Sequence, residues 1–391
     1  MTDLLKGMTM EKVIYLHIGT SKTGTTSIQN FLYRNRKLLA SKGYSFKQMP
    51  MRYDRADRNR NAMFLASHRL TLIGPPTKQQ QEKILNIGLA NIKAQLKHHQ
   101  AVILTDESLW NSFQNKNRKG LRRLKAFADN NNAALKIIVY FRPQEDWLES
   151  SYRQHVKKYK NSNKKNRTLP WDAYINDPAQ WPNADYYTSL SRLAEVVGKD
   201  NIIVRIYDRK NFIGGMIEND FLQAVGLKPS EEYEMLEAER NTSLSANFIE
   251  VKRILDRLDG TGSITDKELI SAESAAINCS ARFSSSGAET FITPEQRAFI
   301  RAHFREGNEK IAKEYLKDRT ELFPEPKEKP VWNRDNPDLY EDTVLLLGHL
   351  ILEKEREINR LKKAVYLRLK IYDKCKALFD KMVQLFMRET P

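Results

Sequence analysis

Cysteine is scarce in this chain, which has only Cys279 and Cys375 among its 391 residues. Two cysteines this far apart build no disulfide framework and are typical of a protein in a reducing compartment. Apolar runs are far shorter than the roughly 20 residues of a membrane-spanning helix, and the first residues lack the apolar stretch of a secretion signal. These absences predict a cytoplasmic protein without a transmembrane span.

Acidic residues are outnumbered, with 49 Asp and Glu against 65 Lys and Arg, and the formal net charge is +16. Such an excess indicates an anionic partner, namely nucleic acid, an acidic glycan, a polyphosphorylated nucleotide or a membrane surface, although it can also serve solubility alone. Tyr159 is the one aromatic residue in the basic runs at 115–125 and 157–167, and this scarcity argues against nucleic acid. The seven histidines are scattered and no paired cysteine motif occurs, so we expect no metal site.

Apolar segments alternate with helical patterns along most of the chain. The pattern predicts strands at 13–18, 101–105, 135–141 and 201–207, and a short one within 42–46. Strands that alternate with helices form βαβ units and a mainly parallel sheet with helices on both faces. We therefore expect an α/β, three-layer fold. Ligands bind beyond the carboxyl ends of the strands in such sheets.

The stretch at 12–29, KVIYLHIGTSKTGTTSIQ, joins the first strand to a helix through a loop of mostly small side chains. Small side chains let backbone N–H groups converge on an anion, and the start of the helix adds free N–H groups and a favourable dipole. Gly19 and Gly24 are spaced as in a nucleotide-binding P-loop, but Lys22 precedes the second glycine instead of following it. Lys22 is thus placed for one phosphate bridged to another group.

Two carboxylates, Asp106 and Glu107, and one arginine, Arg142, follow the second and third of these strands. They should therefore share one crevice with the loop at 19–24. Because Asp106 could mimic the acid that holds Mg²⁺ in NTPases, a P-loop kinase or NTPase stays open as an alternative. A basic nucleic-acid-binding protein is the second alternative.

The KTGTTSIQ segment at 22–29 resembles the 5′-phosphosulfate loop of sulfotransferases that use 3′-phosphoadenosine 5′-phosphosulfate (PAPS), particularly the bacterial and carbohydrate-type members. Arg142 and Ser150 resemble the family's 3′-phosphate motif, an arginine at a strand end and a serine eight residues later. With weaker similarities at 201–212, 241–245 and 294–316, the resemblance covers roughly 12–316. It implies a P-loop-NTPase-like fold, PAPS as co-substrate, no metal, and a carbohydrate or other hydroxyl-bearing acceptor. The Arg-Lys-Gly segment that cytosolic small-molecule members carry near the C-terminal part of the domain is absent from that part of the sequence.

Sulfuryl transfer needs a cation at the leaving phosphate and a base at the acceptor hydroxyl. We assign Lys22 as the cation and Glu107 as the base, with Asp106 and His17 as competitors. The structural alternatives are that Glu107 is paired with a neighbouring Arg or Lys and that His17 belongs to the core. The hydroxyl groups of Thr25 and Thr26 should donate to the 5′-phosphate, and Tyr207 could stack on adenine or belong to the core. The residues expected at the donor are Lys22, Thr23, Gly24, Thr25, Thr26, Ser27, Arg142, Ser150 and Tyr207. Loops such as 51–60, expected on the surface, and 261–293 should bind the acceptor.

The last part of the chain has a different pattern. From Tyr340 to Phe386, apolar residues recur in steps of three and four, the spacing of a coiled coil, with Lys354 and Arg368 as interruptions. Three interpretations remain: a coiled coil that makes a homo-oligomer, two helices folded back on the main domain, or a basic amphipathic helix in peripheral contact with a membrane. The expected organisation is an α/β domain at 11–326, a linker at 327–339 and a helical tail at 340–388.

Overall fold

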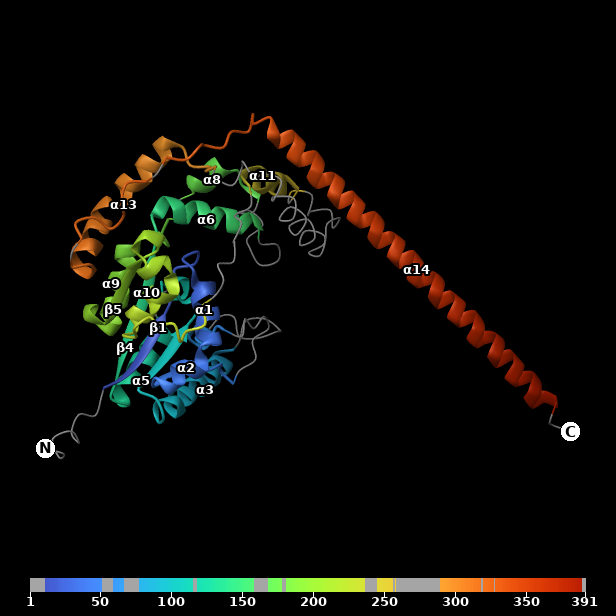
Figure 1. The fold of residues 1–391 in the computed structure, drawn as a ribbon, viewed down its shortest axis with the longest axis horizontal. Helices are drawn as coiled ribbons and strands as arrows, with labels where there is room; N and C mark the ends of the chain where they lie inside the picture. The colour runs from blue at the N-terminus through green and yellow to red at the C-terminus, as the bar shows by residue number, and fades with distance from the viewer. Residues whose placement is uncertain are drawn as a thin grey trace. The chain divides into compact units, whose positions relative to one another are not determined.

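The computed structural model describes most of the chain (Figure 1). The described residues are 11–50, 59–66, 77–114, 118–157, 168–177, 181–235, 245–255, 257, 289–317, 319–326 and 328–388. The chain forms two compact units, each assembled from separate segments. The first unit combines residues 1–152, 171–241 and 292–328, and the second combines 153–170, 242–291 and 329–391.

A five-stranded sheet in the order β2-β3-β1-β4-β5 forms the framework of the first unit, and all neighbouring strands run parallel. The strands are β1 (Lys12–His17), β2 (Tyr44–Ser45), β3 (Ala101–Thr105), β4 (Ala133–Phe141) and β5 (Ile202–Ile206). Leu16 of β1 pairs with Leu104 on one side and Ile137 on the other. Because β1 is central and buried, the loop after it opens at the middle of the sheet's carboxyl edge.

Helices cover both faces of the sheet, because alternate side chains of a strand point to opposite faces. Leu16 and Leu104 pack in one apolar cluster with α3 (Lys78–Leu96), α5 (Lys119–Asn130) and α9 (Tyr186–Val197). Tyr15 and Ile103 pack in another with α1 (Thr25–Arg34), α2 (Arg36–Ser41) and α10 (Ile217–Ala224). The unit is thus a three-layer α/β fold, as the sequence predicted.

Shorter elements and two further helices complete the first unit. They include η1 (Met63–Leu65), α4 (Leu109–Ser112), α8 (Trp171–Ile175), η3 (Lys199–Asn201), η4 (Arg209–Asn211), η5 (Ile213–Gly215) and α13 (Pro294–Tyr315). α6 (Gln144–Lys157) follows β4 and extends beyond the unit's boundary at Tyr152. The predicted strands are confirmed with small shifts, since β4 begins at Ala133 instead of Leu135. Thr293 is the N-cap of α13, since its hydroxyl accepts from the Gln296 N–H at 3.2 Å.

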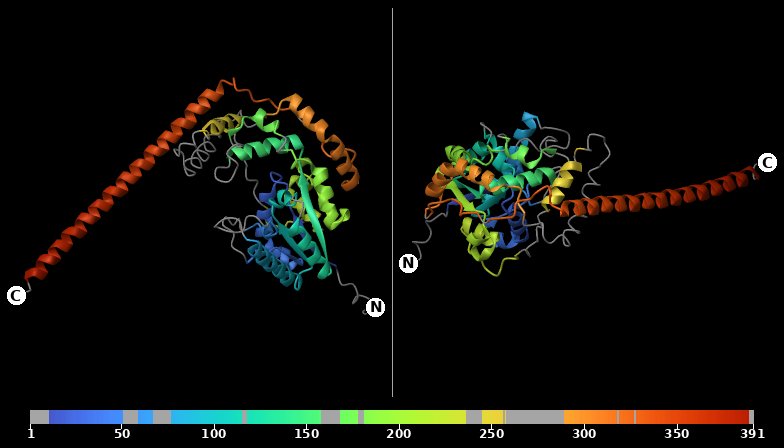
Figure 2. Two further views of the ribbon diagram at one scale, coloured as in Figure 1. Left: turned by 180° about the vertical axis from the view of Figure 1, so that it is seen from behind. Right: turned by 90° about the horizontal axis from the view of Figure 1, so that it is seen from above.

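The second unit contains α11 (Ala246–Leu255) and α14 (Asp338–Arg388). Asn247 joins them, since its Nδ2 donates to Asp342 at 2.8 Å while its Oδ1 accepts from Trp332 at 2.6 Å. α14 is one uninterrupted helix of 51 residues (Figure 2). The interpretation of the tail as two helices is therefore wrong. None of the described helices has the length and apolarity that a membrane span requires.

Several expected features lie outside the described residues. They are the acceptor loops at 51–58 and 261–288, the basic run at 158–167 and most of the similarity at 241–245. The division into a domain at 11–326 and a tail at 340–388 stays a prediction.

Candidate functional site

The carboxyl ends of β1, β3 and β4 lie side by side, because these strands are parallel neighbours in the sheet. The loop at 19–24 follows β1, Asp106 and Glu107 follow β3, and Arg142 follows β4. Three segments that are distant in the sequence therefore meet at one edge of the sheet, as predicted.

Hydrogen bonds to β4 hold the beginning of the loop. The Tyr140 N–H donates to the Gly19 carbonyl at 2.9 Å, and the Thr20 N–H and hydroxyl donate to the Tyr140 carbonyl at 3.2 and 3.1 Å. The buried Thr23 hydroxyl donates to the Thr20 carbonyl at 2.6 Å. Since this side chain is turned into the loop, Thr23 can contribute only its backbone to a ligand site.

Backbone conformation determines how the loop ends. Gly24 has φ of +72°, and a Cβ there would lie 2.6 Å from Cδ1 of Ile217 and 2.9 Å from Cε2 of Tyr207. Only glycine fits both conditions. Lys22 has φ of +67°, which costs a residue with a side chain about 1 kcal/mol and recurs at functional sites. The loop thus presents an exposed lysine just before α1.

The N-terminus of α1 has no side-chain cap. Gly24 is the N-cap residue, and no side chain there accepts a hydrogen bond from the first turn. The helical ladder starts with the Ile28 N–H, which donates to the Gly24 carbonyl at 3.1 Å. The N–H groups of residues 25–27 precede this bond and are directed at whatever lies before the helix. Together with the helix dipole, they favour an anion.

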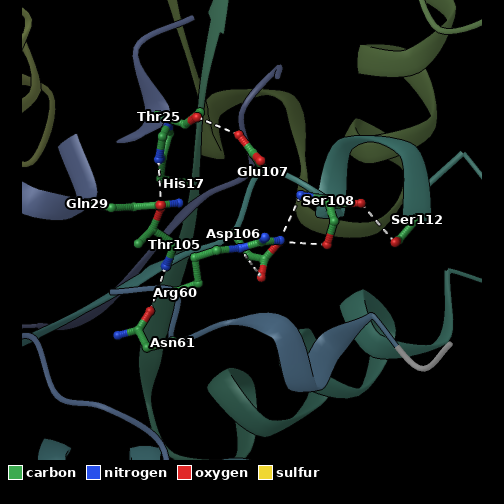
Figure 3. Close-up of polar contacts among 10 residues, drawn as sticks. All are labelled: His17, Thr25, Gln29, Arg60, Asn61, Thr105, Asp106, Glu107, Ser108 and Ser112. Carbon is green, nitrogen blue, oxygen red and sulfur yellow. Dashed lines mark hydrogen bonds and ion pairs between the residues drawn. The ribbon is translucent and has the colours of Figure 1, made fainter. Parts of the chain in front are cut away.

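Glu107 reaches the first turn of α1 from the end of β3. The Thr25 hydroxyl donates to Glu107 Oε2 at 2.6 Å (Figure 3). The Thr25 hydroxyl therefore contacts the expected base in this structure, and its backbone N–H is the group available to a phosphate. Among the described residues, no other hydrogen bond reaches this carboxylate, so Oε1 is left to accept a proton.

Asp106 has a different environment, although it is adjacent to Glu107. Its side chain is fully buried, and Arg60 donates to both oxygens, from Nη2 to Oδ1 at 2.6 Å and from Nε to Oδ2 at 3.2 Å (Figure 3). The Ser108 N–H and hydroxyl also donate to Oδ1, at 2.8 and 2.6 Å. Three of these four donors reach Oδ1 and one reaches Oδ2, so the carboxylate is paired and hydrogen-bonded within the protein. Asp106 therefore stabilises the turn that carries Glu107.

Arg60 is a site residue that the sequence analysis missed. It ends the polar run at 51–60, which we expected on the surface, yet its side chain is only 14% exposed. For Arg60 that expectation is wrong. The next residue, Asn61, is also buried and bonds to β3, accepting from the Thr105 N–H at 2.8 Å and donating to the Ile103 carbonyl at 2.9 Å. The apolar residues at 62–66 were the sequence signal that the chain enters the core here.

His17 is fully buried between two aromatic rings, Tyr140 and Phe221. Its Nδ1 lies 2.9 Å from the Thr105 hydroxyl, which Gln29 of α1 also contacts at 3.5 Å (Figure 3). Burial lowers the pKa of His17 to about 3, so the ring is neutral at ordinary pH. These contacts favour the structural alternative for His17, which links β1 to β3.

The expected donor-binding residues on other elements are partly brought together. Arg142 donates from Nη1 to the Lys22 carbonyl at 3.3 Å, which holds its guanidinium against the loop. Tyr207 lies at the Gly24 backbone, with its ring 5.7 Å from that of Phe212. Ser150 is half-buried, two turns into α6, and makes no hydrogen bond to this group among the described residues. No set of three or more His, Cys, Asp or Glu in the described part of the chain is arranged to hold a metal ion.

Known proteins offer limited comparison. No protein-family model matches the chain. It is 32% identical over 206 residues to an uncharacterized protein of Archaeoglobus fulgidus, and the match covers 52% of each, so the chain spans about half the length of that relative. It is also similar to the crystal structure of a sulfotransferase from Alicyclobacillus acidocaldarius, with 15% identity and a TM-score of 0.34, over 63% of this chain and 95% of that one. A likeness of this size decides neither fold nor function.

Proposed function

We propose that this protein transfers a sulfuryl group from PAPS to a hydroxyl or amine of an acceptor, preferably a carbohydrate. One observation carries the proposal: Glu107 is held at the uncapped start of α1 by the 2.6 Å bond from Thr25, in the same loop region as Lys22. An anion-binding helix start, a cation and an available carboxylate are the groups that this transfer needs.

In the proposed reaction, the acceptor oxygen attacks the sulfur in line with the bridging oxygen of the phosphosulfate. A sulfur–oxygen bond to the acceptor forms while the bond between sulfur and the bridging oxygen breaks. The acceptor proton passes to Oε1 of Glu107, and adenosine 3′,5′-bisphosphate leaves. Lys22 offsets the charge that develops on the leaving phosphate.

The donor would lie across the carboxyl ends of β1 and β4. Backbone N–H groups at 25–27, with the hydroxyl groups of Thr26 and Ser27, suit the 5′-phosphate. Arg142 offers a planar fork of donors for the 3′-phosphate, to which Ser150 would add a hydroxyl. Tyr207, next to Gly24, is the candidate for contact with the adenine.

The net charge of the chain is the basis for proposing the class of acceptor. A net charge of +16 favours an acidic acceptor such as an anionic polysaccharide, because opposite charge raises the rate of encounter. The sequence resemblance to carbohydrate-type sulfotransferases points the same way.

A kinase or NTPase reaction fits this site less well. Such enzymes use a free carboxylate for Mg²⁺, and Asp106 already accepts four hydrogen bonds from Arg60 and Ser108. The lysine that would follow Gly24 in a P-loop is replaced by Thr25.

Calorimetry with the purified protein tests the donor. We expect adenosine 3′,5′-bisphosphate to bind tightly and ATP–Mg²⁺ to bind at least tenfold more weakly. Lys22→Ala should weaken bisphosphate binding, while the control Lys37→Ala, an exposed lysine of α2, should not. Tight binding of ATP–Mg²⁺ without binding of the bisphosphate would overturn the proposal.

The base is tested separately, with radiolabelled PAPS and a panel of glycans. Glu107→Gln should bind the bisphosphate as the wild type does and lose transfer to the acceptor, because the amide takes up no proton. Wild-type turnover in this variant would remove Glu107 as the base and leave the donor assignment intact.

A further inference from the structure

Large apolar side chains are exposed on several sides of α14, and one group of them follows a single line along the helix. We call nine of them, spaced three, four or seven residues apart, the α14 seam, and their exposed fractions run from 40% to 67%: Val344, Leu347, Ile351, Ile358, Leu361, Val365, Tyr372, Phe379 and Met382. From residue 355 to residue 383, every side chain of the helix is exposed. Helices in proteins gain most of their stability by burying such a face, so the α14 seam indicates a partner.

The spacing of the seam identifies the shape of that partner. Steps of three and four over more than five heptads place residues 344, 351, 358, 365, 372 and 379 at a positions and 347, 354, 361, 368, 375 and 382 at d positions. A seam of this period follows a second supercoiled helix. Lys354 and Arg368 are the charged residues at these a and d positions, and a partner helix must accommodate both.

The two halves of α14 carry opposite charge. Residues 338–358 include six acidic and two basic side chains, whereas residues 359–388 include nine basic and two acidic ones. In the acidic half, Glu353, Glu355 and Glu357 alternate with two basic residues, and the basic half has two clusters, at 360–363 and at 368–376. A helix with this pattern is complementary in charge to a copy of itself turned end for end.

We propose that α14 binds α14 of a second copy of this chain as an antiparallel coiled coil. With the pairing centred near residue 363, position 344 lies opposite 382 and position 351 opposite 375 of the second copy. Each a position then meets a d position along an overlap of about 57 Å, at 1.5 Å per residue. The interface is self-complementary about a two-fold axis, as in most homodimers.

This pairing accommodates both charged seam residues. Arg368 of one copy would lie near Glu355 and Glu357 of the other, and Lys354 near the ring of Tyr372. In a parallel pair, each of these cations would instead face the same residue of the second copy. The basic half of one helix would also face the basic half of the other. Because like charges oppose association, the charge pattern favours the antiparallel arrangement.

An anionic lipid surface is the other partner that a basic amphipathic helix can have. It would suit residues 359–388 but would repel the acidic side chains at 353, 355 and 357, which flank the same continuous seam. A second copy accounts for both halves of the helix, and a lipid surface accounts for one.

Sedimentation equilibrium of the full chain at micromolar concentration tests the pairing by charge reversal. We expect the wild type at twice the chain mass of 45.5 kDa. The variant Glu353→Lys, Glu355→Lys, Glu357→Lys should be monomeric, and so should Lys370→Glu, Lys374→Glu, Lys376→Glu. The six-fold variant that combines both should recover the dimer. The control Lys78→Glu, Lys93→Glu, Lys97→Glu, on exposed positions of α3 and its C-cap, should remain dimeric.

Three results would overturn the proposal: a monomeric wild type, a six-fold variant that stays monomeric, or charge reversals that leave the mass unchanged. A monomeric wild type that sediments with vesicles containing phosphatidylglycerol, but not with phosphatidylcholine alone, would assign the face to lipid.

The exposed Cys375 at a d position reports the orientation. In a Cys279→Ala background, the Ile351→Cys variant should form a covalent dimer on mild oxidation, because position 351 then lies opposite Cys375 of the second copy. The background protein, which has Cys375 alone, should not cross-link. Efficient cross-linking of the background protein would show parallel pairing and overturn the antiparallel arrangement.

Discussion

The strand-end site of the first unit and the α14 helix of the second place their side chains in opposite environments. At the site, polar groups are buried: His17 and Asp106 are fully enclosed, and each is bonded to a residue from another part of the chain. On α14, large apolar side chains such as Ile351 and Tyr372 are exposed, at 67% and 64%. Long-range contacts therefore set the geometry of the site, whereas the exposed part of α14 at 355–383 is held by the local hydrogen bonds of the helix. Substitutions should have large effects in the first region and small effects on the isolated chain in the second.

The largest loss of stability is expected from Arg60→Leu. This change leaves the fully buried carboxylate of Asp106 without its cation, and it should lower the free energy of unfolding by about 4 kcal/mol. Urea unfolding measures the loss. The matched control is Arg34→Leu, which breaks the exposed pair with Glu234 and should cost less than about 1 kcal/mol. Equal losses in the two variants would contradict the contrast between buried and exposed pairs.

Lys22→Ala should reduce sulfuryl transfer by about 100-fold, since removing one donor to a developing charge typically costs that much. The fold should be retained because the side chain is exposed. Transfer of radiolabel from PAPS measures the rate, and Lys37→Ala is again the control. Unchanged turnover in Lys22→Ala would show that the leaving phosphate is stabilised elsewhere.

The free energy of unfolding should depend on pH through the buried His17. Burial lowers the pKa of His17 to about 3, below its unfolded value of 6.5, so the unfolded chain binds the extra proton between these values. The contribution of His17 is therefore intact above pH 6.5 and declines as the pH falls toward 3. Between pH 7 and 5 the loss should be about 2 kcal/mol.

Urea unfolding at the two pH values, compared between the wild type and His17→Gln, isolates this contribution from those of other groups. His17→Gln should lose about 2 kcal/mol less than the wild type between pH 7 and 5. The same pH dependence in both proteins would mean that His17 is not the buried neutral group described here.

Thr25→Val should lower transfer by about tenfold, because Glu107 loses the hydroxyl that holds it at the start of α1. Thr25→Ser keeps a hydroxyl and should retain most of the activity. Binding of adenosine 3′,5′-bisphosphate, measured by calorimetry, should change little in either variant, since the backbone N–H at position 25 is unaltered.

The smallest effect is expected on α14. In dilute protein, where the chain is monomeric, Tyr372→Ala should change the free energy of unfolding by less than about 0.5 kcal/mol, because the ring is exposed. Ile137→Ala in the sheet should cost about 3 kcal/mol, because it leaves a cavity. A large loss in Tyr372→Ala under these conditions would show that the helix packs within the chain.

Much of the fold could be predicted because the signals are local. The alternation of apolar strands with amphipathic helices indicated the parallel sheet, and the parallel sheet placed residues 19–24, Glu107 and Arg142 at one edge. Arg60 was missed because the polar run before it looks like a surface loop, and only its ion pair with Asp106, 46 positions along the chain, shows otherwise. The bond from Thr25 to Glu107 also spans 82 positions and leaves no local trace.

By itself, the sequence determined the strand-loop-helix at 12–29, the displaced position of Lys22 and the heptad period of the tail, because backbone propensity and spacing are properties of neighbouring residues. Only the tertiary structure decided between the adjacent carboxylates of Asp106 and Glu107. At the end of β3 one of them turns inward to Arg60, and the other turns toward α1 and Thr25. Which of the two carboxylates forms an ion pair depends on residues that are distant in the sequence.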